Sequence, residues 1–333
     1  TFCKYHTMKG CKVLRKIGWD THGLPVELQV EKELGFHNKS DIENYGIEAF
    51  NQKCRESVWK NEESFARLTN TMGQFIDLKN PYITYNNDYI ETEWWILKKF
   101  FDEGYFYEGS KILPYCPRCG TGLASHEVAQ GYKEVSVDTV IVPMKLKEMD
   151  AYFLVWTTTP WTLISNVAVC VNPNEEYVLC ESKGEKFILA KALANTVLGD
   201  EYTVLETYKG KDLEYKEYEQ LIPELKVSGK AFFVCCDDYA KVGKKYNLPY
   251  VNPVGDDGKY LEGPWKGMLV FDADSEVIKY LKENNKLFKK QRITHNYPHC
   301  WRCNTPLIYY SKPSFYIETT KFKDQIIEAN REV

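Results

Sequence analysis

The chain has 333 residues, of which 44% are hydrophobic and 27% are charged, and these proportions are ordinary for a soluble globular protein with about two domains. No apolar run approaches the roughly 18 residues that a transmembrane helix requires, and no secretory leader opens the chain, so the sequence predicts a cytosolic protein without a membrane partner. The net charge of −4 excludes nucleic-acid binding through overall charge alone, although it is compatible with a local basic patch.

Residues 1–110 predict an α/β region with long helices. Ser40 and Glu43 form a capping box, in which each side chain pairs a backbone N–H of the first helical turn, and apolar residues follow at helical spacing. A second helix is predicted from about Tyr89 to Asp102, with aromatic residues on one stripe. Such a stripe indicates core packing rather than a ligand site.

The segment GWDTHGLPVE, residues 18–27, joins a predicted strand to a predicted helix. Its two glycines allow a backbone turn that brings Trp19 and Asp20 to the end of the strand, and Pro25 favours a helix that begins there. A carboxylate in that place can bind the ammonium group of a ligand. Taken alone, the segment also fits a capped helix start without a site.

Two Cys-x-x-Cys pairs, Cys116 with Cys119 and Cys300 with Cys303, provide four potential metal ligands. Two intervening residues let one tight turn direct both thiolates toward a common point, and four thiolates suit tetrahedral zinc. The sequence therefore predicts one structural zinc that holds together the ends of the region between the pairs. Three histidines are alternative ligands: His126, His295 and His299. The other cysteines are expected to be ordinary thiols, since nothing indicates a disulfide framework: Cys3, Cys11, Cys54, Cys170, Cys180, Cys235 and Cys236.

From about Val135 the pattern changes to short β-rich runs separated by turn signals, and the predicted strands are DTVIVPMKL, YFLVWTTT, NVAVCV, YVLCES and KFILA. One helix is expected late in this region, from about Asp274 to Asn284. Another is expected from Thr320 to Val333, and the chain is expected to be part of a longer one. The β-rich block lies almost wholly between the two Cys-x-x-Cys pairs.

The segment WTTTPWTLISN begins at Trp156 and places three consecutive threonines, Thr157, Thr158 and Thr159, at the end of a predicted strand. Because side chains alternate across a strand, at least some of these hydroxyls can line a small pocket. A hydroxyl without an adjacent base is a poor nucleophile, so hydrogen bonding to a ligand is the expected role. The alternative is a strand edge that is merely rich in β-branched residues.

These segments together resemble one family, the isoleucyl-tRNA synthetases. GWDTHGLPVE is similar to a segment of those enzymes, whereas the valine enzymes carry Thr-Asp-His-Ala-Gly and the leucine enzymes usually carry Ala-Phe in place of Thr-His. WTTTPWTLISN is similar to the threonine-rich signature of the editing domain in all three, which usually has Pro at the position of Ile164. YCPRCGTGLASHEVAQGY, YPHCWRCNTPLIYYSKPSFY and VGKKYNLPYVNPVGDDGKYLEGPWKGMLVFDAD also resemble the family, in its order, so the similarity covers nearly all of the chain.

The resemblance implies an α/β fold with a partial Rossmann-like catalytic domain, into which a β-barrel-like editing domain is inserted through a zinc-bearing junction. The implied boundaries are residues 1–112 for the catalytic part, 113–137 and 290–312 for the junction, 138–289 for the editing domain, and 313–333 for the return into the catalytic part.

The resemblance also implies roles for individual residues. Asp20 would contact the amino group of isoleucine or its adenylate, with Gly18 and Trp19 shaping that site. In the editing domain, Trp156 and the three threonines would bind the terminal adenosine of an aminoacylated tRNA, and Asp238 would hold the ammonium group of the amino acid. The four cysteines would bind one structural zinc.

The implied parent reaction is ligation of isoleucine to tRNA(Ile) with ATP and Mg²⁺, followed by hydrolysis of mischarged valyl-tRNA(Ile), in a monomeric enzyme. Both ATP signatures of the family, His-Ile-Gly-His and Lys-Met-Ser-Lys-Ser, are absent from these 333 residues. They would precede Thr1 and follow Val333, so this chain alone is not expected to form an adenylate.

A second departure concerns the family's Gly-Thr-Gly-Ile-Val-His segment and the Ala-Pro and acidic run after it. Either this stretch is missing, and Asp237 and Asp238 belong to the preceding strand, or CCDDY is its remnant and Asp238 is the ammonium anchor. The histidine is lost in both cases. Two other functions fit part of the pattern: a valine-specific synthetase, and a non-enzymatic zinc-ribbon module that binds RNA or protein.

Overall fold

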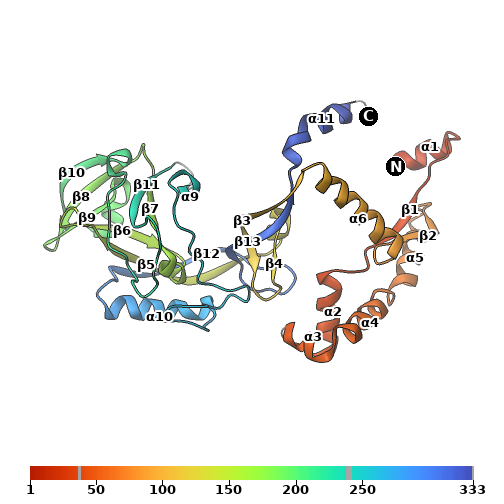
Figure 1. Cartoon of the computed structure of the whole chain (residues 1–333), viewed down its shortest axis with the longest axis horizontal. Helices are drawn as coiled ribbons and strands as arrows, with labels where there is room; N and C mark the ends of the chain where they lie inside the picture. The colour runs from red at the N-terminus through yellow and green to blue at the C-terminus, as the bar shows by residue number, and fades with distance from the viewer. Residues whose placement is uncertain (37–38, 238–241, 332–333) are drawn as a thin grey trace. The chain divides into compact units, whose positions relative to one another are not determined.

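The computed structural model describes residues 1–36, 39–237 and 242–331. The chain divides into two compact units (Figure 1). Unit 1 comprises Thr1–Glu127, Cys300–Asn304 and Tyr309–Val333, and unit 2 comprises Val128–His299 and Thr305–Ile308. The polypeptide therefore leaves and re-enters each unit. Among the described helices, none combines the length and apolarity needed to cross a membrane.

The first part of unit 1 is built on two parallel strands, β1 (Lys16–Trp19) and β2 (Asp77–Ile83). A parallel pair needs a long crossover connection, which here is helical. The helices of this part are α1 (Phe2–Met8), α2 (Leu24–Leu34), α3 (Lys39–Tyr45), α4 (Ile47–Val58) and α5 (Glu62–Thr71). The α/β prediction for this region is confirmed.

The structure differs in two ways from the helix predicted after Ser40. Lys39 and Ser40 are already helical, so Ser40 lies within the first turn and not at the position before it. The expected single helix is also interrupted at Gly46, which has a φ of 103° and separates α3 from α4. Glycine adopts this backbone conformation without the steric penalty of a Cβ atom, and so it breaks the helix at this residue.

The second part of unit 1 contains α6 (Asn87–Asp102), η4 (Thr319–Phe322), α11 (Lys323–Arg331) and a sheet with the strand order β13-β3-β4. These strands are β13 (Ile308–Ile317), β3 (Phe106–Cys116) and β4 (Thr121–Gly122). The prediction of α6 is confirmed, but its aromatic stripe is not core, since Trp94 and Phe101 are 67% and 63% exposed. The last predicted helix begins at Lys323, after the 3₁₀ turn η4.

Unit 2 contains a six-stranded sheet with the order β10-β8-β9-β6-β5-β12. Its strands are β5 (Tyr132–Lys145), β6 (Tyr152–Thr157), β8 (Glu176–Ser182), β9 (Glu185–Ala190), β10 (Thr203–Lys209) and β12 (Lys289–Pro298). All neighbours are antiparallel except β6 and β9. β10 and β12 lie at the edges, so the sheet is open among the described residues and does not form the closed barrel that was expected.

A separate parallel pair joins β7 (Ala168–Val171) to β11 (Phe233–Cys236). The five strands predicted from the sequence are all present, as β5 to β9. The turn between β8 and β9 has positive φ at Lys183 and Gly184, the conformation that suits a two-residue hairpin.

Short helical elements and one longer helix complete the chain: α7 (Ser125–Val128), η1 (Pro160–Ser165), η2 (Lys191–Leu193), α8 (Ala194–Leu198), η3 (Gly210–Leu213), α9 (Val242–Lys245) and α10 (Val270–Glu283). Helix α10 begins four residues before the predicted start and packs against η1. Val270, Ala273 and Val277 are fully buried on its inner face, which extends the apolar stripe N-terminal to Asp274.

Candidate functional site

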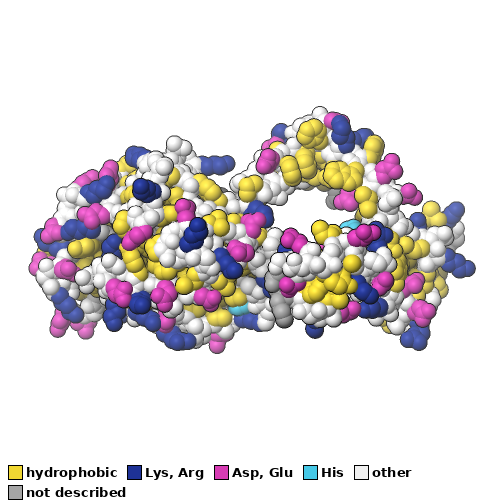
Figure 2. All heavy atoms as spheres, turned by 60° about the horizontal axis from the view of Figure 1, so that its bottom comes forward, with side chains coloured by type: hydrophobic (Ala, Val, Ile, Leu, Met, Phe, Trp, Pro, Cys, Tyr) yellow, Lys and Arg dark blue, Asp and Glu magenta, His cyan; other side chains and the backbone are white. Residues whose placement is uncertain are grey.

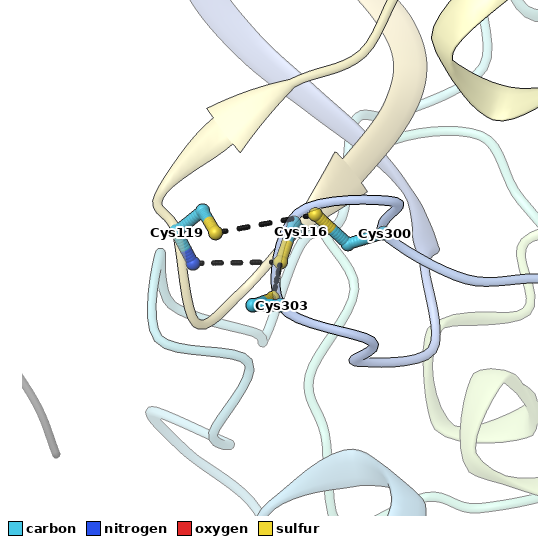
Figure 3. A group of neighbouring side chains, drawn as sticks. All are labelled: Cys116, Cys119, Cys300 and Cys303. Atoms are coloured by element: carbon cyan, nitrogen blue, oxygen red, sulfur yellow. Dashed lines mark hydrogen bonds between the residues drawn. The ribbon is translucent and has the colours of Figure 1, made fainter. Parts of the chain in front are cut away.

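The four cysteines of the two Cys-x-x-Cys pairs come together in unit 1, and Figure 3 shows their sulfur atoms facing one another. All four sulfurs lie within 4.8 Å of one another. Cys116 Sγ is 3.4 Å from Cys303 Sγ, and Cys119 Sγ is 4.0 Å from Cys300 Sγ. Sulfurs bound tetrahedrally at about 2.3 Å from zinc lie about 3.8 Å apart, so these separations fit one ion. We call these residues the four-cysteine cluster.

The two pairs are built alike although their sequences differ. In the first turn Gly120 has a φ of 68° and its N–H donates to the Cys116 carbonyl at 2.8 Å. In the second, Asn304 has a φ of 70° and donates to the Cys300 carbonyl at 2.7 Å. Glycine and asparagine are the residues that most readily adopt this left-handed conformation. The residue after each pair therefore closes the turn that aims both sulfurs inward.

The electrostatics of the cluster favour a cation. Hydrogen bonds from the Cys116 and Cys119 thiols lower the pKa of Cys300 to about 6. The pKa of Cys119 is raised well above its usual range, first by its hydrogen bond to Cys116. Protein groups thus favour the thiolate of Cys300 over that of Cys119, and a bound dication would favour thiolates at the cluster generally. No histidine belongs to this group among the described residues.

Two ion pairs within unit 1 fix the turns of the cluster. Glu127 accepts hydrogen bonds from the Trp301 indole and the Arg302 guanidinium of the second turn. Arg118, between the first two cysteines, lies 3.3 Å from Glu31 of α2. The Glu31 side chain is buried, and burial raises the pKa of its carboxyl group. The charged residues inside both Cys-x-x-Cys pairs are therefore already engaged by unit 1.

The residues of the GWDTHG segment lie at the C-terminal end of β1. A Cβ atom on Gly18 would come within 1.9 Å of the Tyr82 ring, so glycine permits the close approach of β2. Trp19 packs edge-on against Trp59 and Phe65. Asp20 is exposed, and it does not line the neighbouring cavity of about 170 Å³, which begins at Thr21. The segment thus presents a solvated carboxylate at a strand end.

Unit 2 contains a second candidate site, a cavity of about 180 Å³ that we call the hydroxyl-lined cavity. Four segments supply its walls: β5, the turn from β6 into η1, α10, and β12 with the residues that follow it. Its lining residues are Val135, Val137, Thr158, Thr159, Trp161, Phe271, Asp274, His295, Tyr297, His299 and Pro306.

The three consecutive threonines have different partners. The hydroxyls of Thr157 and Thr159 are 3.3 Å apart, and the Thr159 hydroxyl lies 3.3 Å from that of Thr162. The Thr157 oxygen also accepts the Thr159 N–H at 3.1 Å. In the part of the chain that the structure describes, the Thr158 hydroxyl has no protein hydrogen-bond partner. Two threonines therefore hold the turn, and the third leaves its hydroxyl available to a ligand in the cavity.

Asp274 stabilises the start of η1. Its carboxylate accepts the Trp161 N–H at 2.8 Å, and the Trp161 carbonyl accepts the Tyr260 hydroxyl at 2.6 Å. Burial raises the pKa of Asp274 to about 7, although the hydrogen bond from Trp161 opposes this shift. The sequence placed Asp274 only at the start of a helix, because the contact with Trp161 joins residues far apart in the chain.

One of the predicted residues lies elsewhere. Trp156 donates its indole N–H to the Thr139 hydroxyl at 3.2 Å and lines a different, apolar cavity of about 230 Å³. Asp238 lies outside the described residues. Sequence reasoning also missed the role of β12, where His295 and Tyr297 lie on one face because side chains alternate along a strand; His299, just after the strand, also lines the cavity. The alternation of these residues with a period of two was the sequence signal that could have identified this face of the strand.

The comparisons with known proteins agree on one family. A family model described as tRNA synthetases class I (I, L, M and V) matches residues 1–333. Isoleucine--tRNA ligases from Clostridium novyi and Thermus thermophilus are 46% and 42% identical to the chain, and the alignments cover 99% and 100% of it. The protein of the same name from Picrophilus torridus is 43% identical over the whole chain. The chain spans about a third of the length of these relatives, 34–35% in each case.

The alignments also indicate a gap. The one with the Picrophilus torridus protein has 356 positions against the 333 residues of this chain, so more than twenty positions of that relative have no counterpart here. Among solved structures, the editing domain of the Plasmodium knowlesi cytosolic leucyl-tRNA synthetase is 11% identical, with a TM-score of 0.35 over 47% of this chain and 97% of its own. A leucyl-tRNA synthetase of Agrobacterium radiobacter in a tRNA complex is 13% identical, with a TM-score of 0.29 over 91% of this chain and 44% of its own.

Proposed function

The chain belongs to the class I tRNA synthetase family of the isoleucine, leucine, methionine and valine enzymes, and we propose that it serves the ligation of isoleucine to tRNA(Ile) and the hydrolysis of mischarged valyl-tRNA(Ile). The observation that carries isoleucine specificity is the 42–46% identity to isoleucine--tRNA ligases along essentially the whole chain. We propose a monomer that acts in the cytosol with tRNA(Ile), isoleucine and ATP with Mg²⁺ as its partners.

In unit 1, the proposed site for isoleucine is the end of β1. The exposed carboxylate of Asp20 would pair with the ammonium group of the amino acid, and Gly18 and Trp19 would shape the site. ATP with Mg²⁺ would supply the activated carboxyl group. Because the two ATP signatures are not in this sequence, we expect no isoleucine-dependent exchange between ATP and pyrophosphate from this chain alone.

The four-cysteine cluster would hold one structural zinc. Four buried or half-buried sulfurs with tetrahedral spacing leave no open coordination position, so the ion would stabilise the fold and would not bind substrate. We expect its contribution to local order to be on the order of 10 kcal/mol, as in zinc-finger peptides.

Unit 2 would carry the hydrolytic function, with residues 138–289 as the editing domain. The need for a separate hydrolytic step is established for the isoleucine enzymes themselves, because a difference of one methylene is worth only about 1–3 kcal/mol of discrimination between amino acids. The Thr158 hydroxyl and the turn held by Thr157 and Thr159 would orient the terminal adenosine. Water would be the nucleophile, and Asp238 would hold the ammonium group.

Deacylation measures the proposed function directly. The chain is incubated with valyl-tRNA(Ile) and, separately, with isoleucyl-tRNA(Ile), and release of free amino acid is followed. We expect faster release of valine than of isoleucine, and loss of turnover in Thr158→Val. Equal rates on both substrates would contradict an editing role. Turnover that survives Asp238→Ala would exclude Asp238 as the anchor.

A further inference from the structure

Asp274 supplies the one carboxylate among the described residues that line the hydroxyl-lined cavity, and no lysine or arginine is among them. The residue lies on α10, and its Oδ1 atom accepts the Trp161 N–H at 2.8 Å. The other oxygen, Oδ2, has no hydrogen-bond partner in the described part of the chain, and it is not one of the enclosed polar atoms there. Oδ2 is therefore an accessible acceptor on a residue of the cavity wall.

The charges around Asp274 favour a cationic ligand. Burial raises the pKa of its carboxyl group to about 7, and the negative charge of Asp138 on β5 acts in the same direction. Lys290 of β12 does not compensate, because its Nζ pairs with Asp138 at 2.8 Å. The other ionisable side chains of the cavity are Tyr297 and the imidazoles of His295 and His299. A positive charge brought by a ligand would favour the ionised form of Asp274, since an opposite charge close by stabilises a carboxylate.

The rest of the wall is compatible with a primary ammonium group. Trp161, Phe271 and Tyr297 line the cavity, and an aromatic ring attracts a cation that approaches its face. The Thr158 hydroxyl has no protein partner among the described residues, and an ammonium group has three N–H donors to share between acceptors. The cavity therefore combines an anionic acceptor, a neutral acceptor and aromatic side chains, which together suit the amino group of an amino acid.

We propose that Asp274 binds the α-ammonium group of the aminoacyl ester in this cavity through Oδ2. The assignment rests on the proposed editing function and adds a substrate-binding residue to it, whether or not Asp238 provides a second carboxylate. Oδ1 holds the start of η1, which directly follows Thr158 and Thr159, while Oδ2 holds the ligand. One side chain thus places the ammonium group relative to the threonine turn. An acyl group that lacks the ammonium group loses this contact and binds more weakly.

Two ligands and one isosteric substitution test the contact by calorimetry at pH 7. The non-hydrolysable amide 3′-valylamino-3′-deoxyadenosine keeps the α-ammonium group, and its 3-methylbutanoyl counterpart lacks only that group. We expect the wild-type chain to bind the first about tenfold or more tightly than the second. In Asp274→Asn this ratio should fall to about one, because asparagine can still accept the Trp161 N–H but carries no charge. Asp272→Asn, at an exposed residue of the same helix, is the matched control and should keep the wild-type ratio.

The ratio of the two affinities distinguishes a substrate contact from a purely structural role of Asp274. A structural role would weaken both ligands alike, so an unchanged ratio in Asp274→Asn overturns the contact. A ratio near one in the wild-type chain, or no binding of either ligand, overturns it without any variant. Deacylation of valyl-tRNA(Ile) is measured separately. If the chain releases no valine, the proposed hydrolytic function fails, and the ligand ratio still decides the contact.

Discussion

The four-cysteine cluster and the hydroxyl-lined cavity differ in how completely their polar atoms are engaged. In the cluster the sulfurs contact one another, and the charged residues of both turns are paired with unit 1. In the cavity the Thr158 hydroxyl and His295 Nε2 lack protein partners among the described residues. On the face shown in Figure 2, acidic and basic side chains are intermingled, so the distribution of charge there does not indicate a further site. A saturated site is suited to hold a fold, whereas an unsaturated one is suited to bind and transform a ligand.

The largest effect is expected from breaking the cluster. Cys300→Ser removes a buried ligand, so we expect loss of the one zinc per chain and a local destabilisation on the order of 10 kcal/mol. Zinc content is measured by elemental analysis after dialysis, and unfolding by circular dichroism. Cys3→Ser, at an exposed cysteine, is the matched control and should retain the metal. Equal zinc content in the two variants would rule out the four-cysteine assignment.

A pH effect of a few kcal/mol is expected from the cavity. The pKa of Asp274 is about 7 in the folded protein and near 4 when unfolded, so the folded state binds more protons between these values. The free energy of unfolding should therefore fall as the pH rises from about 4 to about 7, by at most about 1.4 kcal/mol per unit. Urea unfolding at several pH values measures this slope. Asp274→Asn should flatten it, and Asp272→Asn, at an exposed residue of α10, should not.

The two turns of the cluster could be predicted from the sequence because the geometry of each turn is local, whereas their meeting joins residues about 180 positions apart. Each Cys-x-x-Cys pair closes its own turn, and Gly120 and Asn304 provide the required backbone conformation. The strands β5 to β9 could also be predicted, because the alternation of apolar residues and the turn residues between strands are local signals. The helix break at Gly46 was missed because apolar spacing continued across it.

The cavity could be predicted only in part because its walls come from four segments distant in the chain. The threonine run identified one wall, but the contact between Asp274 and Trp161 depends on how α10 packs against η1. Trp156 illustrates the same limit, because it is adjacent to the threonines in sequence but lines another cavity. Likewise, α6 has a stripe typical of a core helix, although its aromatic residues are exposed.

An intermediate effect is expected from the turns of the cluster. Gly120→Ala places a Cβ in the left-handed region at a φ of 68°, which costs about 1–2 kcal/mol. We expect a lower melting temperature and weaker retention of zinc against a chelator. Gly122→Ala is the control, since its φ is not positive and its Cβ would meet only ordinary contacts at 3.6 Å or more. Similar losses in both variants would show that the backbone conformation of the turn is not the cause.

The smallest effect on stability is expected from substituting two neighbouring threonines of the cavity. The two substitutions should differ clearly in which property they change. Thr159→Val removes a hydroxyl that contacts those of Thr157 and Thr162, and we expect about 1 kcal/mol of destabilisation. Thr158→Val removes a hydroxyl without a protein partner, so unfolding by urea should change by less than about 0.5 kcal/mol while deacylation of valyl-tRNA(Ile) is lost. Valine keeps the branched shape in both cases, so the comparison isolates the hydroxyl. If Thr158→Val destabilised the chain as much as Thr159→Val, its hydroxyl would have a structural partner, and the cavity would be as saturated as the cluster.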